Sequence, residues 1–81
     1  MQIKLLFFAS YQDIAGSPEM TVDLADGATA ADCAAWLTER YPGFAAVLPH
    51  GRIAVNLDMA EPSTPLTDGD TVAFMPPMSG G

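Results

Sequence analysis

Residues 71–81 read Thr71-Val-Ala-Phe-Met-Pro-Pro-Met-Ser-Gly-Gly81. Val72 and Phe74 alternate with smaller side chains, which predicts a short β-strand with one apolar face. Two prolines fix φ and keep the chain extended beyond this strand, and the two final glycines carry no Cβ. We therefore expect a folded domain over residues 1–75 and a flexible, slim tail over residues 76–81 that presents a carboxylate. The alternative is a frayed end without a function, since chain ends are often disordered.

The segments before this ending alternate between strand-like and turn-like stretches. Period-two patterns of apolar side chains predict strands, and clusters of Gly, Pro and Asp predict turns. We expect strands over residues 2–9, 20–24, 52–58 and 71–75, a connecting loop over 11–18, a short turn over 44–48 and a turn-rich segment over 59–70.

A helix is predicted between the second and third strands. Thr29 and Asp32 have the spacing of a capping box, and the Ala-, Leu- and Glu-rich stretch after them continues to about Tyr41, where Pro42-Gly43 ends it. The order strand–strand–helix–strand–strand predicts an α+β fold. Its mixed sheet would have four or five strands, with one main helix packed on one face.

One helix can cover only one face of such a sheet. The side chains expected to face the helix are Ile3, Leu5, Phe7, Ile53, Val55, Val72 and Phe74. The opposite face still carries Leu6, Phe8, Ala54 and Met75. If the first and last strands are neighbours, Leu6, Phe8 and Met75 form one exposed apolar patch, and such patches usually mark interaction sites. The alternative is that residues 59–70 fold over them.

The chain is strongly acidic. Ten acidic residues oppose Lys4, Arg40 and Arg52, which gives a formal net charge of −7. Three scattered cations cannot neutralise a row of phosphates, so we expect no nucleic-acid partner, and the same charge argues against anionic membranes. An acidic domain is instead steered toward a basic protein surface, although acidity can also serve only to keep a small protein soluble.

The composition predicts a single cytoplasmic domain. Hydrophobic residues make up 49% of the 81 residues, which is enough for one core. The first residues lack the basic region and long apolar stretch of a secretory signal, and no apolar run approaches the ~20 residues of a membrane span. One cysteine, Cys33, cannot form an internal disulfide.

The side chains that could carry chemistry are better explained by structure. Cys33 lies on the apolar side of the predicted helix without a nearby His or cation in sequence, which is typical of a buried, inert thiol. His50 lies in a turn without a second ligand at a useful spacing, so we expect no metal site. Asp68 and Asp70 flank Gly69, as in a tight turn between strands.

The order of elements and the Gly-Gly ending resemble the ubiquitin-like β-grasp proteins. Within that group, the stretch Leu66-Thr-Asp-Gly-Asp-Thr-Val-Ala-Phe-Met-Pro-Pro-Met-Ser-Gly-Gly81 is similar to the ending of the molybdopterin synthase small subunits, the MoaD-type sulfur carriers. Ile3-Lys-Leu-Leu-Phe-Phe-Ala9 and Ala54-Val-Asn56 fit the same family, and the resemblance covers the whole chain. Met75 and Met78 differ from the residues most common in that family, but both remain apolar.

This resemblance implies a sulfur carrier that is not itself a catalyst. An ATP-dependent, E1-like activating enzyme would adenylate the carboxylate of Gly81, and sulfur would then replace oxygen to give a thiocarboxylate. The large subunit of molybdopterin synthase would receive the tail, supply the catalytic residues and transfer the sulfur to a cyclic pterin precursor in molybdenum cofactor biosynthesis. This chain would bind no cofactor, because the activating enzyme uses the ATP. The residues expected to contact the partner proteins are Leu6, Phe8, Met75, Pro76, Pro77, Met78, Ser79 and Gly80.

Other functions share parts of this pattern. A thiamine-type sulfur carrier has the same fold and ending, but lacks the approach seen here at Phe74-Met-Pro-Pro77. A ubiquitin-like modifier would be activated in the same way and would then be joined to a lysine of a target. An interaction domain without covalent chemistry would tolerate any residue at position 81.

Overall fold

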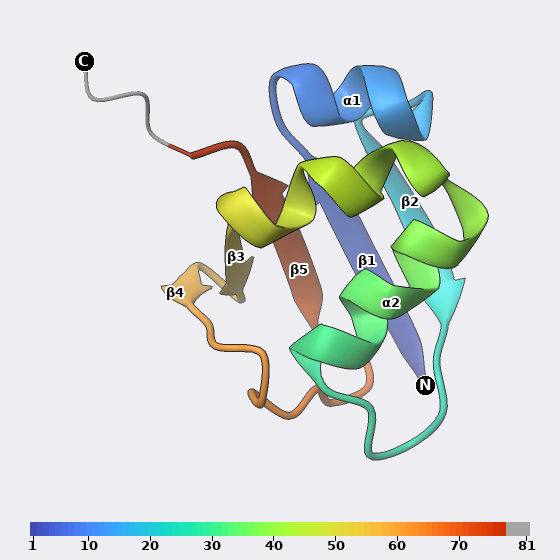
Figure 1. Cartoon of the computed structure of the whole chain (residues 1–81). Coiled ribbons are helices and arrows are strands. Elements are labelled where there is room, and N and C mark those ends of the chain that lie inside the picture. Colours follow the sequence, from blue (N-terminus) through green and yellow to red (C-terminus); the bar gives the residue numbers. More distant parts are fainter. Residues whose placement is uncertain (78–81) are drawn as a thin grey trace.

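The structure of the chain is a computed structural model that describes residues 1–77 (Figure 1). Its strands are β1 (Gln2–Phe7), β2 (Glu19–Asp23), β3 (Arg52–Val55), β4 (Asp58–Met59) and β5 (Thr71–Met75). Its helical segments are α1 (Ser10–Ala15), α2 (Ala30–Arg40) and the 3-10 turns η1 (Pro42–Ala46) and η2 (Leu48–His50). In the described residues, none of the helices is long and apolar enough to cross a membrane.

The five strands form one mixed sheet in the order β2-β1-β5-β3-β4. β1 pairs in parallel with β5, whereas the pairs β1–β2, β3–β5 and β3–β4 are antiparallel. The parallel pair requires a long connection between its strands, and the chain from β2 to β4 provides it. The predicted α+β fold is confirmed, and the first and last strands are neighbours at the centre of the sheet.

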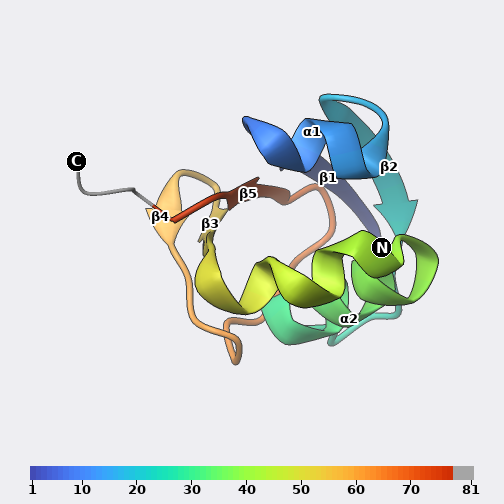
Figure 2. The same cartoon turned by 45° about the horizontal axis from the view of Figure 1, so that its top comes forward.

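Helix α2 begins where its capping residues predict. The main-chain N–H of Asp32 donates to Thr29 Oγ1 at 3.3 Å, and the N–H of Thr29 donates to Asp32 Oδ2 at 2.8 Å, so the two residues cap each other. The helix buries Ala30, Cys33 and Leu37 against the sheet. Figures 1 and 2 show α2 and the 3-10 turns after it together on one side of the strands.

The core lies between these helical segments and the inner face of the sheet. Ile3, Leu5, Phe7, Val72 and Phe74 are at most 1% exposed, while Ile53 and Val55 are partly buried against the same cluster. All seven inward-facing residues are therefore predicted correctly. Phe44 of η1 completes this core, because its ring stacks on that of Phe7 with centroids 5.7 Å apart.

The loop expected over residues 11–18 is wrong, because residues 10–15 form α1. The chain leaves β1 through Ala9, whose positive φ of 51° turns it sharply into the helix, and Gly16 ends the helix in the left-handed conformation. Tyr11 and Ala15 lie four residues apart and are both buried, which is the spacing of one helical face. Six residues are too few for that spacing to stand out in a sequence.

The strand expected over residues 52–58 is likewise only partly correct. It divides into β3 and β4, which form a hairpin around the two-residue turn Asn56-Leu57. Both turn residues have positive φ, 51° and 73°. The alternation of Ile53, Val55 and Leu57 continues through this turn and conceals it, because no glycine marks the reversal.

The connection between β4 and β5 packs against the start of α2. The N–H groups of Ala30 and Ala31 donate to the carbonyls of Thr64 and Pro62, both at 2.9 Å, and the N–H of Leu66 donates to Ala28 O. These bonds hold the segment beside the helix. The alternative that residues 59–70 fold over the opposite face of the sheet is therefore wrong.

Candidate docking face and tail root

The C-terminal tail begins at the centre of the sheet. β5 is bonded along one edge to β1 and along the other to β3, and its last residue, Met75, pairs with Arg52. A strand paired on both sides is a rigid base for Pro76 and Pro77, which follow it directly. Met78, Ser79, Gly80 and Gly81 lie outside the described residues, so their roles and the division of the chain at residue 76 stay predictions.

Gly51 allows the chain to pass tightly against this tail root. A Cβ on residue 51 would lie 2.6 Å from the main-chain oxygen of Met75 and would collide with the hydroxyl oxygen of Tyr11. That hydroxyl donates a hydrogen bond of 3.0 Å to Val47 O. Gly51, the Tyr11 hydroxyl of α1 and the main-chain oxygen of Met75 therefore meet at the end of β5.

The outer face of the sheet carries an apolar row across four strands. Leu6 of β1 pairs with Ala73 of β5, Ala73 pairs with Ala54 of β3, and Ala54 pairs with Met59 of β4. Paired residues share one face of a sheet, so these four side chains are neighbours. The strand alternation places Phe8 and Met75 on the same side, nearer the tail. We call the surface formed by Leu6, Phe8, Ala54, Met59, Ala73 and Met75 the outer apolar face.

Several of these side chains are open to solvent. Phe8 is 45% and Met59 60% exposed, whereas Leu6, Ala73 and Met75 are partly buried by their neighbours in the sheet. The structure therefore brings Leu6, Phe8 and Met75 together as expected, while their contact with a partner stays a prediction. Sequence reasoning missed Met59, because its place on this face depends on the register that the Asn56-Leu57 turn sets.

Charged side chains border the outer apolar face. Lys4 Nζ lies 3.6 Å from Glu19 Oε2 on the β1–β2 side, and the exposed Arg52 pairs with Met75 beside the tail root. An apolar centre with a polar rim is the usual composition of a protein–protein interface.

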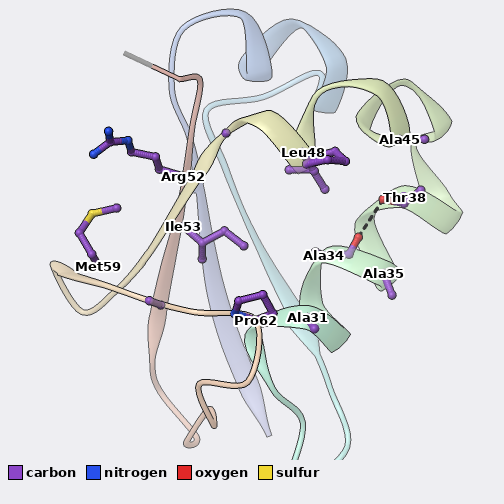
Figure 3. A pocket seen from close by; sticks show the side chains of 13 residues that line it. Ala31, Ala34, Ala35, Thr38, Ala45, Leu48, Arg52, Ile53, Met59 and Pro62 are labelled. Carbon is purple, nitrogen blue, oxygen red and sulfur yellow. Dashed lines mark hydrogen bonds between the residues drawn. The ribbon is translucent and has the colours of Figure 1, made fainter.

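A hollow lies on the helical side of the sheet, between α2, η2 and the β3–β4 hairpin. It has a volume of about 650 Å³ and is lined mainly by apolar side chains, among them Ala31, Ala34, Leu48 and Ile53. Figure 3 shows the hydroxyl of Thr38 bonded to the carbonyl of Ala34, at 3.0 Å, so it is not directed into the hollow. A small-molecule site usually has several polar groups that converge on the ligand, and this lining does not provide such a set.

The other candidate side chains have structural roles. Cys33 is fully buried, and burial raises the pKa of its thiol to about 12, so the reactive thiolate is suppressed. The carboxylates of Asp68 and Asp70 accept hydrogen bonds from the main-chain N–H groups of Gln2 and Thr67, at 2.7 and 2.8 Å. These bonds confirm that the two aspartates hold the turn before β5.

Comparison with known proteins identifies the family. Residues 5–81 match the ThiS family. The chain belongs to this family. It is 40% identical over 83 residues to the molybdopterin synthase sulfur carrier subunit of Chlamydomonas reinhardtii, and the match covers 100% of both chains. It is 33% identical over 94 residues to the small archaeal modifier protein 3 of Haloferax volcanii, again over 100% of both.

Solved structures confirm the fold of this ThiS-family chain. The crystal structure of SAMP1 from Haloferax volcanii is similar, with a TM-score of 0.87, 27% identity and 100% of both chains covered. The complex of subunits 1 and 2 of the molybdopterin-converting factor from Helicobacter pylori contains a chain with a TM-score of 0.73, 26% identity and 100% coverage of both. The resemblance to β-grasp sulfur carriers inferred from the sequence is therefore confirmed.

Proposed function

We propose that this chain is the sulfur-carrier subunit of molybdopterin synthase. The observation that carries the proposal is its 40% identity to the Chlamydomonas sulfur carrier subunit over the full length of both chains. The geometry is consistent with this role. The tail leaves the central strand of the sheet beside the outer apolar face, so docking of that face would place the tail at a fixed position on a partner.

The first chemical step is activation of the Gly81 carboxylate. A free carboxylate is a poor electrophile, so an activating enzyme first joins one carboxylate oxygen to the α-phosphate of ATP and releases pyrophosphate. A sulfur nucleophile at the oxidation level of sulfide then attacks the activated carbonyl, and AMP departs with that oxygen. The product is a thiocarboxylate at Gly81. In this scheme the activating enzyme binds the ATP, and the chain itself binds no cofactor. The reaction takes place in the cytoplasm.

The second step takes place in the large subunit. The thiocarboxylate sulfur attacks the pterin precursor and displaces a leaving group, and water then cleaves the resulting thioester, so that the sulfur stays on the pterin and the Gly81 carboxylate is regenerated. Holding the thiocarboxylate in the partner's pocket makes the transfer effectively unimolecular. In this proposal the catalytic acid and base groups come from the large subunit. Cys33 takes no part in proton transfer near neutral pH, because its thiol is buried and its pKa is raised to about 12.

The outer apolar face is the docking surface in this proposal. Phe8 and Met75 lie nearest the tail root, and Leu6 connects them to the apolar row that ends at Met59. The solved complex of subunits 1 and 2 from Helicobacter pylori supports a large subunit as the partner.

Intact-mass spectrometry tests the carrier function directly. The chain is incubated with ATP, the activating enzyme and a sulfur donor, and the mass should increase by the difference between sulfur and oxygen. Addition of the large subunit and the pterin precursor should return the chain to its original mass. A chain lacking Gly81 is the matched control. An unchanged mass of the full chain under all these conditions would contradict the proposal.

A second candidate function is supported by the relative from Haloferax volcanii. The match to small archaeal modifier protein 3 also covers both chains completely. A modifier would be activated in the same way, but an amine of a target lysine would attack the activated Gly81 and form an isopeptide bond. Branched peptides in which the C-terminal segment of this chain is joined through Gly81 to a target lysine, found by mass spectrometry of cells expressing the chain, would identify this function.

A further inference from the structure

Leu57 combines an unfavourable backbone conformation with almost complete exposure. Its φ is 73°, a left-handed value that favours Gly or Asn and is disfavoured for a bulky side chain. Its side chain is 97% exposed, so it gains nothing from burial within this domain. Residues held in such strained conformations cluster at binding and catalytic sites. Neither burial nor backbone preference within this domain therefore explains why residue 57 is a leucine.

The turn that carries Leu57 is firmly fixed. Asn56 Nδ2 donates to Asp70 Oδ1 at 2.8 Å, while the N–H of Thr71 donates to Asn56 Oδ1 at 3.0 Å. The N–H of Asn56 donates in turn to Thr71 O at 2.8 Å. These three bonds tie the hairpin to the start of β5 and hold the Leu57 side chain away from the body of the protein.

Leu57 lies in the turn of the β3–β4 hairpin, near the Met59 end of the outer apolar face and far from the tail. It lies two residues before Met59, the last member of the apolar row across the sheet. Val55 pairs with the start of β5 at Val72, whereas Met75 pairs with Arg52 at the other end, so the hairpin turn and the tail root lie at opposite ends of β5. Contacts at both ends of β5 would restrict rotation of the domain about its tail more than contacts of the outer apolar face alone.

The charges around the turn indicate what the partner surface must offer. Asp58 follows Leu57 directly and is exposed, and Asp70 is bonded to Asn56. A surface that combines an apolar pocket with basic side chains at its edge is complementary to this turn, because an acidic edge would repel the exposed carboxylate of Asp58.

We propose that Leu57 is a second docking contact, which inserts into an apolar pocket edged by basic side chains on the large subunit and so orients the carrier about its tail. The proposal rests on the sulfur-carrier function argued above. It adds to the outer apolar face a residue that contributes to binding at the expense of the stability of the isolated domain.

Three substitutions distinguish the effect of the backbone strain at Leu57 from the effect of its apolar side chain. Leu57→Gly and Leu57→Asn relieve the left-handed strain and remove the apolar side chain, whereas Leu57→Met keeps a large apolar side chain in the same conformation. Thermal unfolding should show an equal or higher Tm for the Gly and Asn variants. Titration calorimetry with the purified large subunit should show binding weakened at least about tenfold for both, and within about twofold of wild type for Met.

The opposite directions of the two readouts make the test decisive. The role of Leu57 would be overturned if the Gly and Asn variants bound the large subunit as tightly as the wild-type chain does. That result would leave the carrier function intact. The same conclusion would follow if these variants lost affinity only for the activating enzyme. A wild-type chain that does not bind the large subunit would contradict the proposed function, and the docking role of Leu57 with it.

Discussion

Gly51 and Met75 approach so closely that a Cβ on residue 51 would lie 2.6 Å from the main-chain oxygen of Met75. The backbone φ of Gly51 is −92°, which any residue can adopt, so the requirement for glycine comes from space rather than from conformation. This contact lies where β5 ends and the tail begins. The sequence at position 51 therefore bears directly on the geometry of the tail root.

Gly51→Ala should destabilise the domain by about 1–3 kcal/mol, because the added methyl group must displace either the end of β5 or the Tyr11 hydroxyl. Denaturant unfolding followed by circular dichroism measures this loss. Gly43→Ala is the matched control, since a Cβ there would meet only the side chain of Ile14, at 3.1 Å, which can move. Equal unfolding free energies for the two variants would show that the contact at Gly51 is easily relieved.

Phe8→Asp and Met75→Asp should each weaken binding to the large subunit by more than about 1 kcal/mol while leaving the fold intact, because both place a charge in the outer apolar face near the tail. Gel filtration and titration calorimetry measure complex formation. Gln12→Asp, on the exposed side of α1, adds the same charge elsewhere and should bind like wild type. Unchanged affinity in the Phe8 and Met75 variants would exclude this face as the docking surface.

Cys33 should make the domain less stable at high pH. Burial raises its pKa from an ordinary value of 9.0 to about 12, so above pH 9.0 the unfolded chain loses the thiol proton before the folded chain does. Stability from this group is complete below pH 9.0 and declines by at most about 1.4 kcal/mol per pH unit as the pH rises toward 12.

The Cys33→Ala variant isolates this contribution, because it lacks the titrating group. Unfolding free energies of the variant and of wild type should converge between pH 9 and pH 11. A constant difference across that range would mean that the thiol does not titrate differently in the two states. Thiol reagents should also label Cys33 only after denaturant unfolds the chain, since the side chain is fully buried.

The inner face of the sheet and the start of α2 were predictable because local patterns specify them. Alternation of apolar side chains places Phe7 and Phe74 in the core, and the reciprocal bonds between Thr29 and Asp32 follow from their spacing. The sequence alone did not establish that β1 and β5 are neighbours, since no local signal specifies which strands pair. The exposed apolar patch was therefore predicted only for the case that they are. The structure shows that pairing, with Lys4 to Phe7 of β1 beside Thr71 to Phe74 of β5.

The parts that the sequence misrepresented depend on residues in unusual conformations. Ala9 and Leu57 adopt positive φ without being glycine, so the turn into α1 and the turn between β3 and β4 lack the glycine that usually marks such turns. The second of these turns sets the register that places Met59 on the outer apolar face. The missed part of the candidate docking surface and the missed hairpin therefore have the same physical cause.

The central claim is that the carboxylate of Gly81 carries the sulfur, and comparison of the full chain with a chain lacking Gly81 tests it most directly. Both are assayed in a reconstituted reaction with the activating enzyme, a sulfur donor, the large subunit and the pterin precursor. Deletion should leave the Tm nearly unchanged, yet it withdraws the carboxylate by one residue, roughly 3.5 Å, and should abolish formation of molybdopterin. Formation of molybdopterin at the wild-type rate by the shortened chain would contradict the account.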